Sequence, residues 1–365
     1  MENYSSEVMD LFIHSKYGDE QMYKNSQVDA VYLWCDGEDP NFIAERAERE
    51  MNYKKNQKDS LFYQAEAMRE YLDPEKRYKN NDELKYSLRS LEKYAPWINH
   101  IFIITNNQKP AWLRNNNKIT IVDHADIIPK HLLPTFNSTT IEQYIINING
   151  LSEKFILLND DMFFNKETPK SVFFEDEKPI VYLQEPWDSY ISSYQDAEEL
   201  KERKASPYLK SVLNGYLLMQ SHGRPFIDFR CPTHCIDAYS KSILLSIFKD
   251  YSELYDINTY PFRNPKEIVR AFWLLEMAYF YNCPLKIHGF PKKILDRLLF
   301  KFGLKKIVCY EFQAGYATSR FKDLIRNLEK YDPYFFCCNN LTGVVADRVI
   351  KYLERRFPEK SSFEI

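Results

Sequence analysis

Short apolar runs alternate with amphipathic stretches along the first 165 residues, and this alternation is the clearest structural signal in the chain. Runs of apolar residues that end at polar or turn-forming residues are typical of buried strands. The strands predicted in this way are residues 28–34, 100–105, 119–123 and 155–158.

Two amphipathic stretches between these runs indicate helices. Residues 81–94 carry leucines at helical spacing, and Asn81 is the expected N-cap. Residues 138–148 carry isoleucines at the same spacing, and Thr139 with Glu142 has the pattern of a capping box. Both stretches therefore predict helices that bury one face.

Strands that alternate with helices fold into an α/β unit with a mainly parallel sheet. We therefore predict a Rossmann-like sheet in the first half of the chain and a mostly helical C-terminal part. The expected organisation is an N-terminal arm (1–27), a Rossmann-like half (28–165) with a helical insertion (41–75), a helical or irregular half that completes the active site (166–345) and a C-terminal tail (346–365).

Composition narrows the function classes. The chain has 365 residues, is 44% hydrophobic and carries a formal net charge of −3, which argues against a general nucleic-acid binder. It contains only 9 Gly, and neither a GxGxxG nor a GxxxxGK[ST] phosphate loop is present. Any bound phosphate must therefore be held by side chains, helix N-termini or a metal ion.

The cysteine content bears on location and on metal binding. The chain has 7 Cys, an odd number, and opens without a recognisable signal peptide, so we predict free thiols in a reducing, cytoplasmic compartment. Cys231, His234 and Cys235 have the spacing of half a zinc site, but no second half stands out in the sequence. No apolar run reaches the roughly 20 residues that span a bilayer, so we expect a soluble or peripheral protein.

Acidic residues follow two of the predicted strands. Asp36 and Asp39 come after the first, and Asn159, Asp160 and Asp161 come after the fourth. Ligands of open α/β sheets bind beyond the carboxyl ends of the strands, and adjacent carboxylates at such a position are costly unless a cation or donors satisfy them. The pattern predicts a site for a metal ion or a nucleotide; the alternative is a solvated loop with a helix cap.

A charged cluster lies at the start of the helix predicted over residues 81–94. It comprises Arg77, Asn81, Glu83, Lys85 and Arg89. Arginine suits bidentate contact with phosphate, so the cluster is a candidate for binding a phosphorylated ligand. The alternative is an ordinary salt-bridged surface helix.

Two residues of the second half are candidates for the reacting centre. His234 lies in a proline-containing turn, and a histidine can act as a general base near neutral pH. Arg263 lies in the turn PFRNP and is suited to stabilise charge on a transferring phosphoryl group. The alternative for His234 is a structural histidine whose ring is hydrogen-bonded.

Residues 291–306 read PKKILDRLLFKFGLKK, which is a basic amphipathic pattern. Wound as a helix, it places bulky apolar residues on one face and Lys293, Arg297 and Lys301 on the other. Such a helix can lie in the headgroup region of an anionic membrane, or it can pack on the core with a solvated basic face. The first interpretation predicts peripheral contact with the inner face of the cytoplasmic membrane.

Taken together, these strings resemble the conserved blocks of the Stealth family. The likeness lies in VDAVYLWCDGEDPNF (28–42), RYKNNDELKYSLRSLEKYAPWINHIFIITNNQKPAWL (77–113), LPTFNSTTIEQYIINI (133–148), FILLNDDMFF (155–164), RCPTHCID (230–237), FRNPKEIVRAFWLLEMAYFY (262–281) and FFCCNNLTG (335–343). The family includes bacterial capsular and exopolysaccharide phosphotransferases and the catalytic subunit of the animal N-acetylglucosamine-1-phosphotransferase. The resemblance covers most of residues 28–343.

The resemblance implies an activity and a set of site residues. It implies transfer of a hexose- or N-acetylhexosamine-1-phosphate from a UDP-sugar to a hydroxyl of an oligo- or polysaccharide, with release of UMP and a requirement for Mg²⁺ or Mn²⁺. The Rossmann-like half then resembles a nucleotide-sugar transferase core. The implied site residues are His234, Arg263 and Asp39 as catalytic groups, Asp160 and Asp161 as metal ligands, and Asp36, Arg77, Asn81, Glu83, Arg89 and Asn159 as donor- or phosphate-binding groups.

The chain departs from the family pattern at several positions. Lys85 stands where Arg is usual, Asn339-Asn340 stands where Asn-Asp is usual, and the second histidine often found near Cys231 is absent. Two other functions stay open beside the implied one. They are an ordinary glycosyltransferase that releases UDP and a catalytically silent sugar-binding protein of the assembly machinery.

Overall fold

A computed structural model describes residues 27–56, 73, 77–184, 207–225, 229–288, 301, 307–313 and 321–365. A five-stranded sheet in the order β3-β2-β1-β4-β9 lies at its centre, and within this sheet β9 alone runs antiparallel to its neighbour. Its strands are β1 (Val28–Leu33), β2 (Ile101–Thr105), β3 (Ile119–Asp123), β4 (Lys154–Asn159) and β9 (Asp237–Ser240). The predicted α/β fold with a mainly parallel sheet is confirmed.

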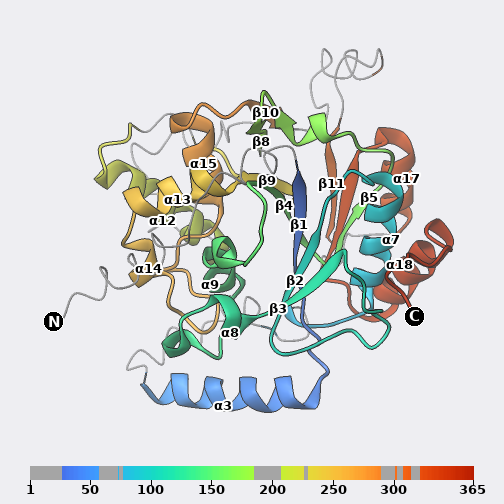
Figure 1. Cartoon of the computed structure of the whole chain (residues 1–365), viewed down its shortest axis with the longest axis horizontal. Helices are drawn as coiled ribbons and strands as arrows, with labels where there is room; N and C mark the ends of the chain where they lie inside the picture. Colours follow the sequence, from blue (N-terminus) through green and yellow to red (C-terminus); the bar gives the residue numbers. More distant parts are fainter. Residues whose placement is uncertain are drawn as a thin grey trace.

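Helices cover both faces of this sheet (Figure 1). One face carries α8 (His124–Ile127), α9 (Ser138–Gln143), α12 (Pro207–Ser221), α13 (Lys241–Asp250), α14 (Leu254–Ile257) and α15 (Ala271–Phe280), and the other carries α7 (Glu83–Tyr94). Successive residues of a strand point to opposite faces. Val31 and Leu157 therefore belong to the first core, whereas Ala30 and Ile156 belong to the second.

A second sheet, of three strands in the order β11-β12-β5, packs beside α7. Its strands are β5 (Met162–Phe164), β11 (Cys309–Gln313) and β12 (Phe335–Asn339). Two buried serines of α7 hold β5: Ser87 Oγ donates to the carbonyl of Met162, and the N–H of Phe164 donates to Ser90 Oγ at 2.9 Å. Because β5 follows β4 after only two residues, the chain passes abruptly from one sheet to the other.

The C-terminal half contributes strands as well as helices, and the sequence analysis did not predict those strands. Most of them have only two to four residues, too few for a periodic signal. Besides β9, β11 and β12 they are β6 (Phe174–Glu175), β7 (Lys178–Pro179), β8 (Val181–Gln184) and β10 (Leu285–His288). The remaining described helices are α3 (Pro40–Asn56), α17 (Phe321–Tyr331) and α18 (Gly343–Arg356), with 3-10 turns at Lys130–Leu132, Ile145–Asn147 and Lys170–Val172.

The helix starts differ from their predicted positions. The N-cap of α7 is Asp82, whose side chain makes no capping hydrogen bond, and the side-chain amide of Asn81 donates to Glu83. The N-cap of α9 is Asn137, whose side chain accepts from the N–H of Thr139, while the Thr139 hydroxyl donates to Glu267 at 3.1 Å. The predicted apolar stripes are confirmed, since Leu84, Leu88, Leu91, Ile141, Ile145 and Ile148 are all buried.

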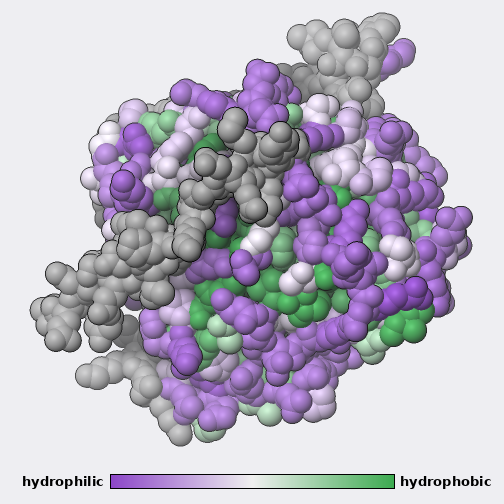
Figure 2. All heavy atoms as spheres, viewed as in Figure 1, coloured by the Kyte–Doolittle hydropathy of each residue, from purple (hydrophilic) through white to green (hydrophobic). Residues whose placement is uncertain are grey.

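Several sequence predictions fall where the structure gives little description. The N-terminal arm up to residue 26 and all of the amphipathic segment 291–306 except Lys301 lie outside the described residues, so membrane contact stays a prediction. Among the helices that are described, none is long and apolar enough to cross a membrane. Polar side chains cover most of the face drawn in Figure 2, and apolar ones gather near its middle. The domain boundaries also stay predictions.

The segment predicted as a C-terminal tail packs on the molecule instead. Arg89 of α7 donates from Nε and Nη2 to the two carboxylate oxygens of Glu364, at 2.7 and 2.6 Å, and from Nη1 to the carbonyl of Phe357 at 2.7 Å. Burial raises the pKa of Glu364, but the hydrogen bonds and charge of Arg89 together with the hydrogen bonds from Ser361 leave it below its ordinary value. The guanidinium of Arg89 thus binds the C-terminal residues, and its predicted role in donor binding stays a prediction.

We predict that Arg89→Met lowers the free energy of unfolding by about 3 kcal/mol at pH 7, because it leaves the buried carboxylate of Glu364 unpaired. The lowered pKa of Glu364 means that the pair stabilises above the unfolded pKa of about 4.5 and that this contribution is lost as pH falls through the folded pKa. Urea unfolding of wild type and variant at pH 7 and near pH 3 measures the difference, which should shrink in acid. 

The matched control is Arg326→Met, which removes an exposed pair with Asp323 and should cost less than about 1 kcal/mol. An Arg89→Met protein with wild-type stability and weakened binding of a nucleotide sugar would instead support a role of Arg89 in donor binding.

Candidate active site

Two acidic residues form the turn between β4 and β5. Asp160 and Asp161 are partly buried there, and the register of β4 on β1 places Asn159 beside Leu33 at the ends of both strands. Ligands of such sheets bind beyond the carboxyl ends of the strands. The acidic turn thus lies at the edge of the sheet where the sequence analysis expected polar residues to gather.

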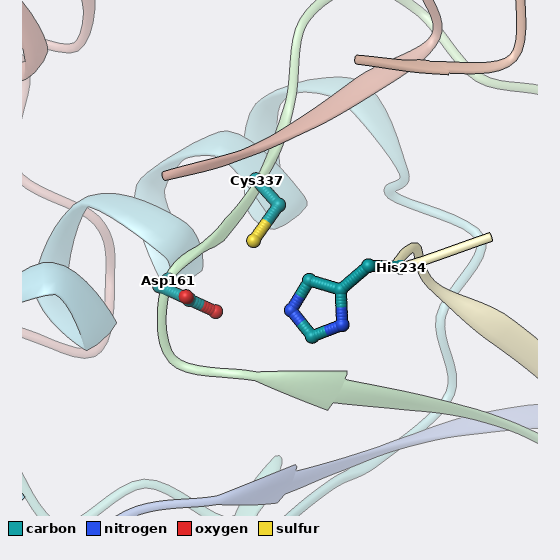
Figure 3. Close-up of side chains that lie close together, drawn as sticks. All are labelled: Asp161, His234 and Cys337. Carbon is teal, nitrogen blue, oxygen red and sulfur yellow. The ribbon is translucent and has the colours of Figure 1, made fainter. Parts of the chain in front are cut away.

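Asp161, His234 and Cys337 meet here from three distant segments (Figure 3). One ligand atom of each lies within 4.8 Å of those of the other two. His234 comes shortly before β9, and Cys337 lies in β12 opposite Met162, the residue that follows the acidic turn. The sequence analysis singled out Asp161 and His234 but missed Cys337, since nothing near Cys337 in the chain points to the other two.

Negative charges crowd the acidic turn. Burial raises the pKa of Asp160 well above its ordinary value, and the carboxylates of Glu83 and Asp161 raise it further. Burial also raises the pKa of Asp161, to about 7. A hydrogen bond from the Cys337 thiol opposes this rise, and the charge of Glu83 adds to it. Oδ1 of Asp161 is buried and has no hydrogen-bond partner among the described residues. A buried carboxylate oxygen without a donor is a fitting ligand for a divalent cation.

Asn81 holds the third carboxylate of this group. Glu83 is buried, and its carboxylate accepts from the N–H and from the side-chain Nδ2 of Asn81, both at 2.6 Å. The same Nδ2 donates to the carbonyl of Leu341 at 3.3 Å, which joins the start of α7 to the segment after β12. The structure thus places Glu83 in the acidic group and Asn81 in a supporting position.

Positive charges act on His234 from several segments. Burial, together with the charges of Arg270, Arg263 and Arg77, lowers the pKa of His234 to about 3. The imidazole is therefore neutral near pH 7 and keeps a nitrogen lone pair that can accept a proton. Arg263 also donates from Nη2 to the hydroxyl of Ser138, the first residue of α9, at 2.8 Å.

Arg270 is a residue of this region that the sequence analysis missed. It directly precedes α15 and forms ion pairs with Asp237 (Nε to Oδ2, 3.5 Å) and Glu142 (Nη1 to Oε1, 3.3 Å). Burial raises the pKa of Asp237 to about 7, although Arg270 opposes the rise. The contacts link α9, β9 and α15 close to His234. An arginine at the head of the apolar stretch AFWLLEMAYF was the available signal.

Two other predicted residues lie in the loop after β1. Asp39 caps α3, since its Oδ1 accepts from the N–H of Phe42 at 2.9 Å. Asp36 lies near the acidic turn. The residue before it, Cys35, has a raised pKa, mainly through burial and further through the charges of Asp160 and Asp36. The catalytic role of Asp39 and the donor-binding role of Asp36 stay predictions.

Comparison with known proteins places the acidic turn inside a described family region. A family model named Stealth protein CR2, conserved region 2, matches residues 77–181. The chain is 29% identical to the capsular polysaccharide phosphotransferase WcwK of Streptococcus pneumoniae over 94% of this chain and 99% of the relative. It is 38% identical to the capsular polysaccharide phosphotransferase eps5J of Streptococcus thermophilus over 46% of this chain and 67% of the relative.

Other matches extend over much of the chain. The exopolysaccharide phosphotransferase CpsY of Mycobacterium tuberculosis is 30% identical over 92% of this chain, which spans 58% of the length of that relative. Among solved structures, the galactosyltransferase LgtC in complex with donor and acceptor sugar analogues matches with a TM-score of 0.39 and 7% identity, over 91% of this chain and 96% of LgtC.

We predict that Asp160→Asn stabilises the metal-free protein by about 1 kcal/mol at pH 8, because it removes one of the crowded carboxylates without changing the shape of the turn. Thermal unfolding in excess EDTA measures the change. Asp347→Asn, at an exposed position of α18, is the control and should change stability by less than about 0.5 kcal/mol. A lower melting temperature for Asp160→Asn would show that hydrogen bonds to Asp160 outweigh the repulsion.

Proposed function

The chain belongs to the Stealth family, and from this membership and the candidate site we propose that it is a sugar-phosphate transferase of capsular or exopolysaccharide synthesis. In this proposal a hexose- or N-acetylhexosamine-1-phosphate moves from a UDP-sugar to a hydroxyl of an oligo- or polysaccharide acceptor, and UMP leaves. The observation that carries the proposal is the meeting of an acidic group and a set of arginines at one neutral histidine.

The acidic group suits a divalent metal ion. Asp160 and Asp161 would hold Mg²⁺ or Mn²⁺, because their carboxylates repel one another and Oδ1 of Asp161 lacks a donor among the described residues. When bound, such an ion neutralises charge on a diphosphate. Glu83, fixed by Asn81, adds to the negative potential that attracts the cation.

The arginines suit the phosphate oxygens of the donor. Arg263 and Arg77 lie close enough to lower the pKa of His234, so their charges reach the place where a bound phosphoryl group would meet the imidazole. A guanidinium there stabilises the equatorial oxygens during phosphoryl transfer. The hydrogen bond of Arg263 to Ser138 fixes its direction in advance, which is how positioning contributes to such reactions.

His234 is proposed as the general base that accepts the proton of the acceptor hydroxyl. Its pKa of about 3 keeps the ring neutral and ready to accept, but makes it a weak base in the free protein. A diphosphate beside the same arginines would offset their charge and raise the pKa of His234 towards the working pH. Binding of the donor would therefore strengthen the base.

Two alternatives are separable by the product. An ordinary glycosyltransferase breaks the C1–O bond and releases UDP, whereas the proposed reaction releases UMP. A catalytically silent sugar-binding protein binds nucleotide sugars without releasing either nucleotide. The location at the inner face of the cytoplasmic membrane stays a prediction.

We predict that turnover requires Mg²⁺ or Mn²⁺ and that Asp161→Asn lowers it by at least about 100-fold, because the variant loses a charged ligand of the metal while keeping the side-chain volume. The measurement is UMP release from a panel of UDP-sugars with capsule fragments as acceptors. The exposed substitution Asp347→Asn should leave the rate unchanged. Full activity in excess EDTA would refute the metal requirement.

We further predict that His234→Ala lowers kcat by roughly 10²–10⁴-fold, as loss of a general base does, while the affinity for the donor changes little. Donor binding by calorimetry and UMP release separate the two effects. His131→Ala, at an exposed position, is the matched control. Collapse of donor affinity with an unchanged kcat would make His234 a structural or binding residue instead.

A further inference from the structure

We propose that Asp161, His234 and Cys337 also form a binding site for a thiophilic divalent cation such as Zn²⁺, and that its occupation blocks the transfer reaction. The three side chains offer one carboxylate oxygen, one imidazole nitrogen and one sulfur, all within 4.8 Å of one another. Figure 3 shows the His234 ring facing the Asp161 carboxylate, with the sulfur of Cys337 close to both.

The backbone holds these three residues in fixed relative positions. Cys337 lies in β12, which pairs with β5 directly after Asp161, and the N–H of Cys338 donates to the carbonyl of Asp161 at 3.0 Å. The carbonyl of His234 accepts from the Cys309 thiol of the neighbouring β11 at 3.5 Å. A metal can therefore bind through small side-chain rotations, without refolding of the segments that carry its ligands.

The ligand set favours a different cation from the one proposed for the reaction. Mg²⁺ takes oxygen ligands in near-octahedral geometry, and a sulfur and an imidazole nitrogen are poor ligands for it. Cysteine, histidine and one carboxylate are ligands of Zn²⁺, with metal–ligand distances of about 2.0–2.3 Å and a fourth position left for solvent. The thiol of Cys337 gives its proton to solvent when the metal–sulfur bond forms.

A buried acceptor without a partner is the second observation that points to a ligand here. Oδ1 of Asp161 has no hydrogen-bond partner among the described residues. The sequence offered only Cys231, His234 and Cys235 as half of a zinc site, whereas the fold joins His234 to residues that lie far away in the chain. The proposed site therefore shares His234 with that sequence pattern but takes Asp161 and Cys337 as the other ligands.

The effect on turnover rests on the proposed function, whereas the binding does not. A cation on the imidazole of His234 occupies the lone pair that would accept the acceptor's proton. The same cation shares Asp161, so it also competes with Mg²⁺ or Mn²⁺. Inhibition should therefore weaken when Mg²⁺ is raised at constant Zn²⁺.

Binding is tested on the full chain after chelator dialysis, by titration with Co²⁺ and with Zn²⁺. We expect one equivalent of Co²⁺ to give a thiolate-to-metal charge-transfer band that Zn²⁺ abolishes. Cys337→Ser should remove the band and weaken Zn²⁺ binding in calorimetry by more than about 100-fold. This is a larger loss than the change of a residue that only hydrogen-bonds to a metal ligand would cause. His234→Gln should also weaken it strongly.

The matched control is Cys338→Ser. Cys338 is the next residue of β12, and its side chain belongs to the opposite core, so the variant changes a buried thiol that is not one of the three ligands. It should bind Co²⁺ as wild type does. Circular dichroism and thermal unfolding confirm that each variant is folded. A charge-transfer band that persists in folded Cys337→Ser, or the lack of any band in wild type, would overturn the site.

The inhibition is tested by measuring UMP release at fixed Mg²⁺ while the Zn²⁺ concentration is raised. The rate of each variant is compared with the rate of the same variant without zinc. We expect Cys337→Ser to need at least about 10-fold more Zn²⁺ for half-inhibition than wild type or Cys338→Ser, because it loses one metal ligand. Equal sensitivity of all three proteins would overturn the inhibitory role. A wild type that binds Zn²⁺ but transfers from no UDP-sugar would instead overturn the proposed function and leave the site standing.

Discussion

The acidic turn between β4 and β5 is the constraint on which the rest of the site depends. Two residues must carry the chain from the main sheet to the second sheet, and both of them are aspartates. The parallel ladder with β1 fixes the turn on one side, and the pairing of β5 with β12 and with the serines of α7 fixes it on the other. The backbone therefore keeps the two aspartates close together, and their crowded carboxylates suit a bound cation.

The sequence predicted the main sheet well because its strands and helices have strong local patterns. The runs over β1, β2 and β4 are mostly apolar and buried, as strands covered on both faces require, whereas β3 lies at the edge of the sheet and is only partly buried. The second sheet was missed because β5 has three residues and β12 pairs with it from the other end of the chain. The helix starts were misplaced by one or two residues, since the N-caps are Asp82 and Asn137, while the side chains of Asn81 and Thr139 donate to Glu83 and Glu267.

The residues of the candidate site also divide into those that the local sequence marks and those that only the fold reveals. Asp160, Asp161 and His234 stood out because each lies in a short string of unusual composition, so local sequence and family resemblance both pointed to them. Arg89 stood out for the same reason, but its partner Glu364 lies at the far end of the chain. Cys337 was missed for the reverse reason: nothing in its local sequence marks it, and only the fold of β12 places it beside Asp161 and His234.

The two halves of the site depend on one another through charge. Burial and the neighbouring carboxylates raise the pKa of Asp160 and Asp161, and burial and the nearby arginines lower the pKa of His234. In the proposed function a divalent cation would offset the negative charge at the acidic turn, and the diphosphate of the donor would offset the positive charge of the arginines. Binding of both ligands together would therefore neutralise both groups of charges, and it would raise the pKa of His234 towards the value that a general base needs.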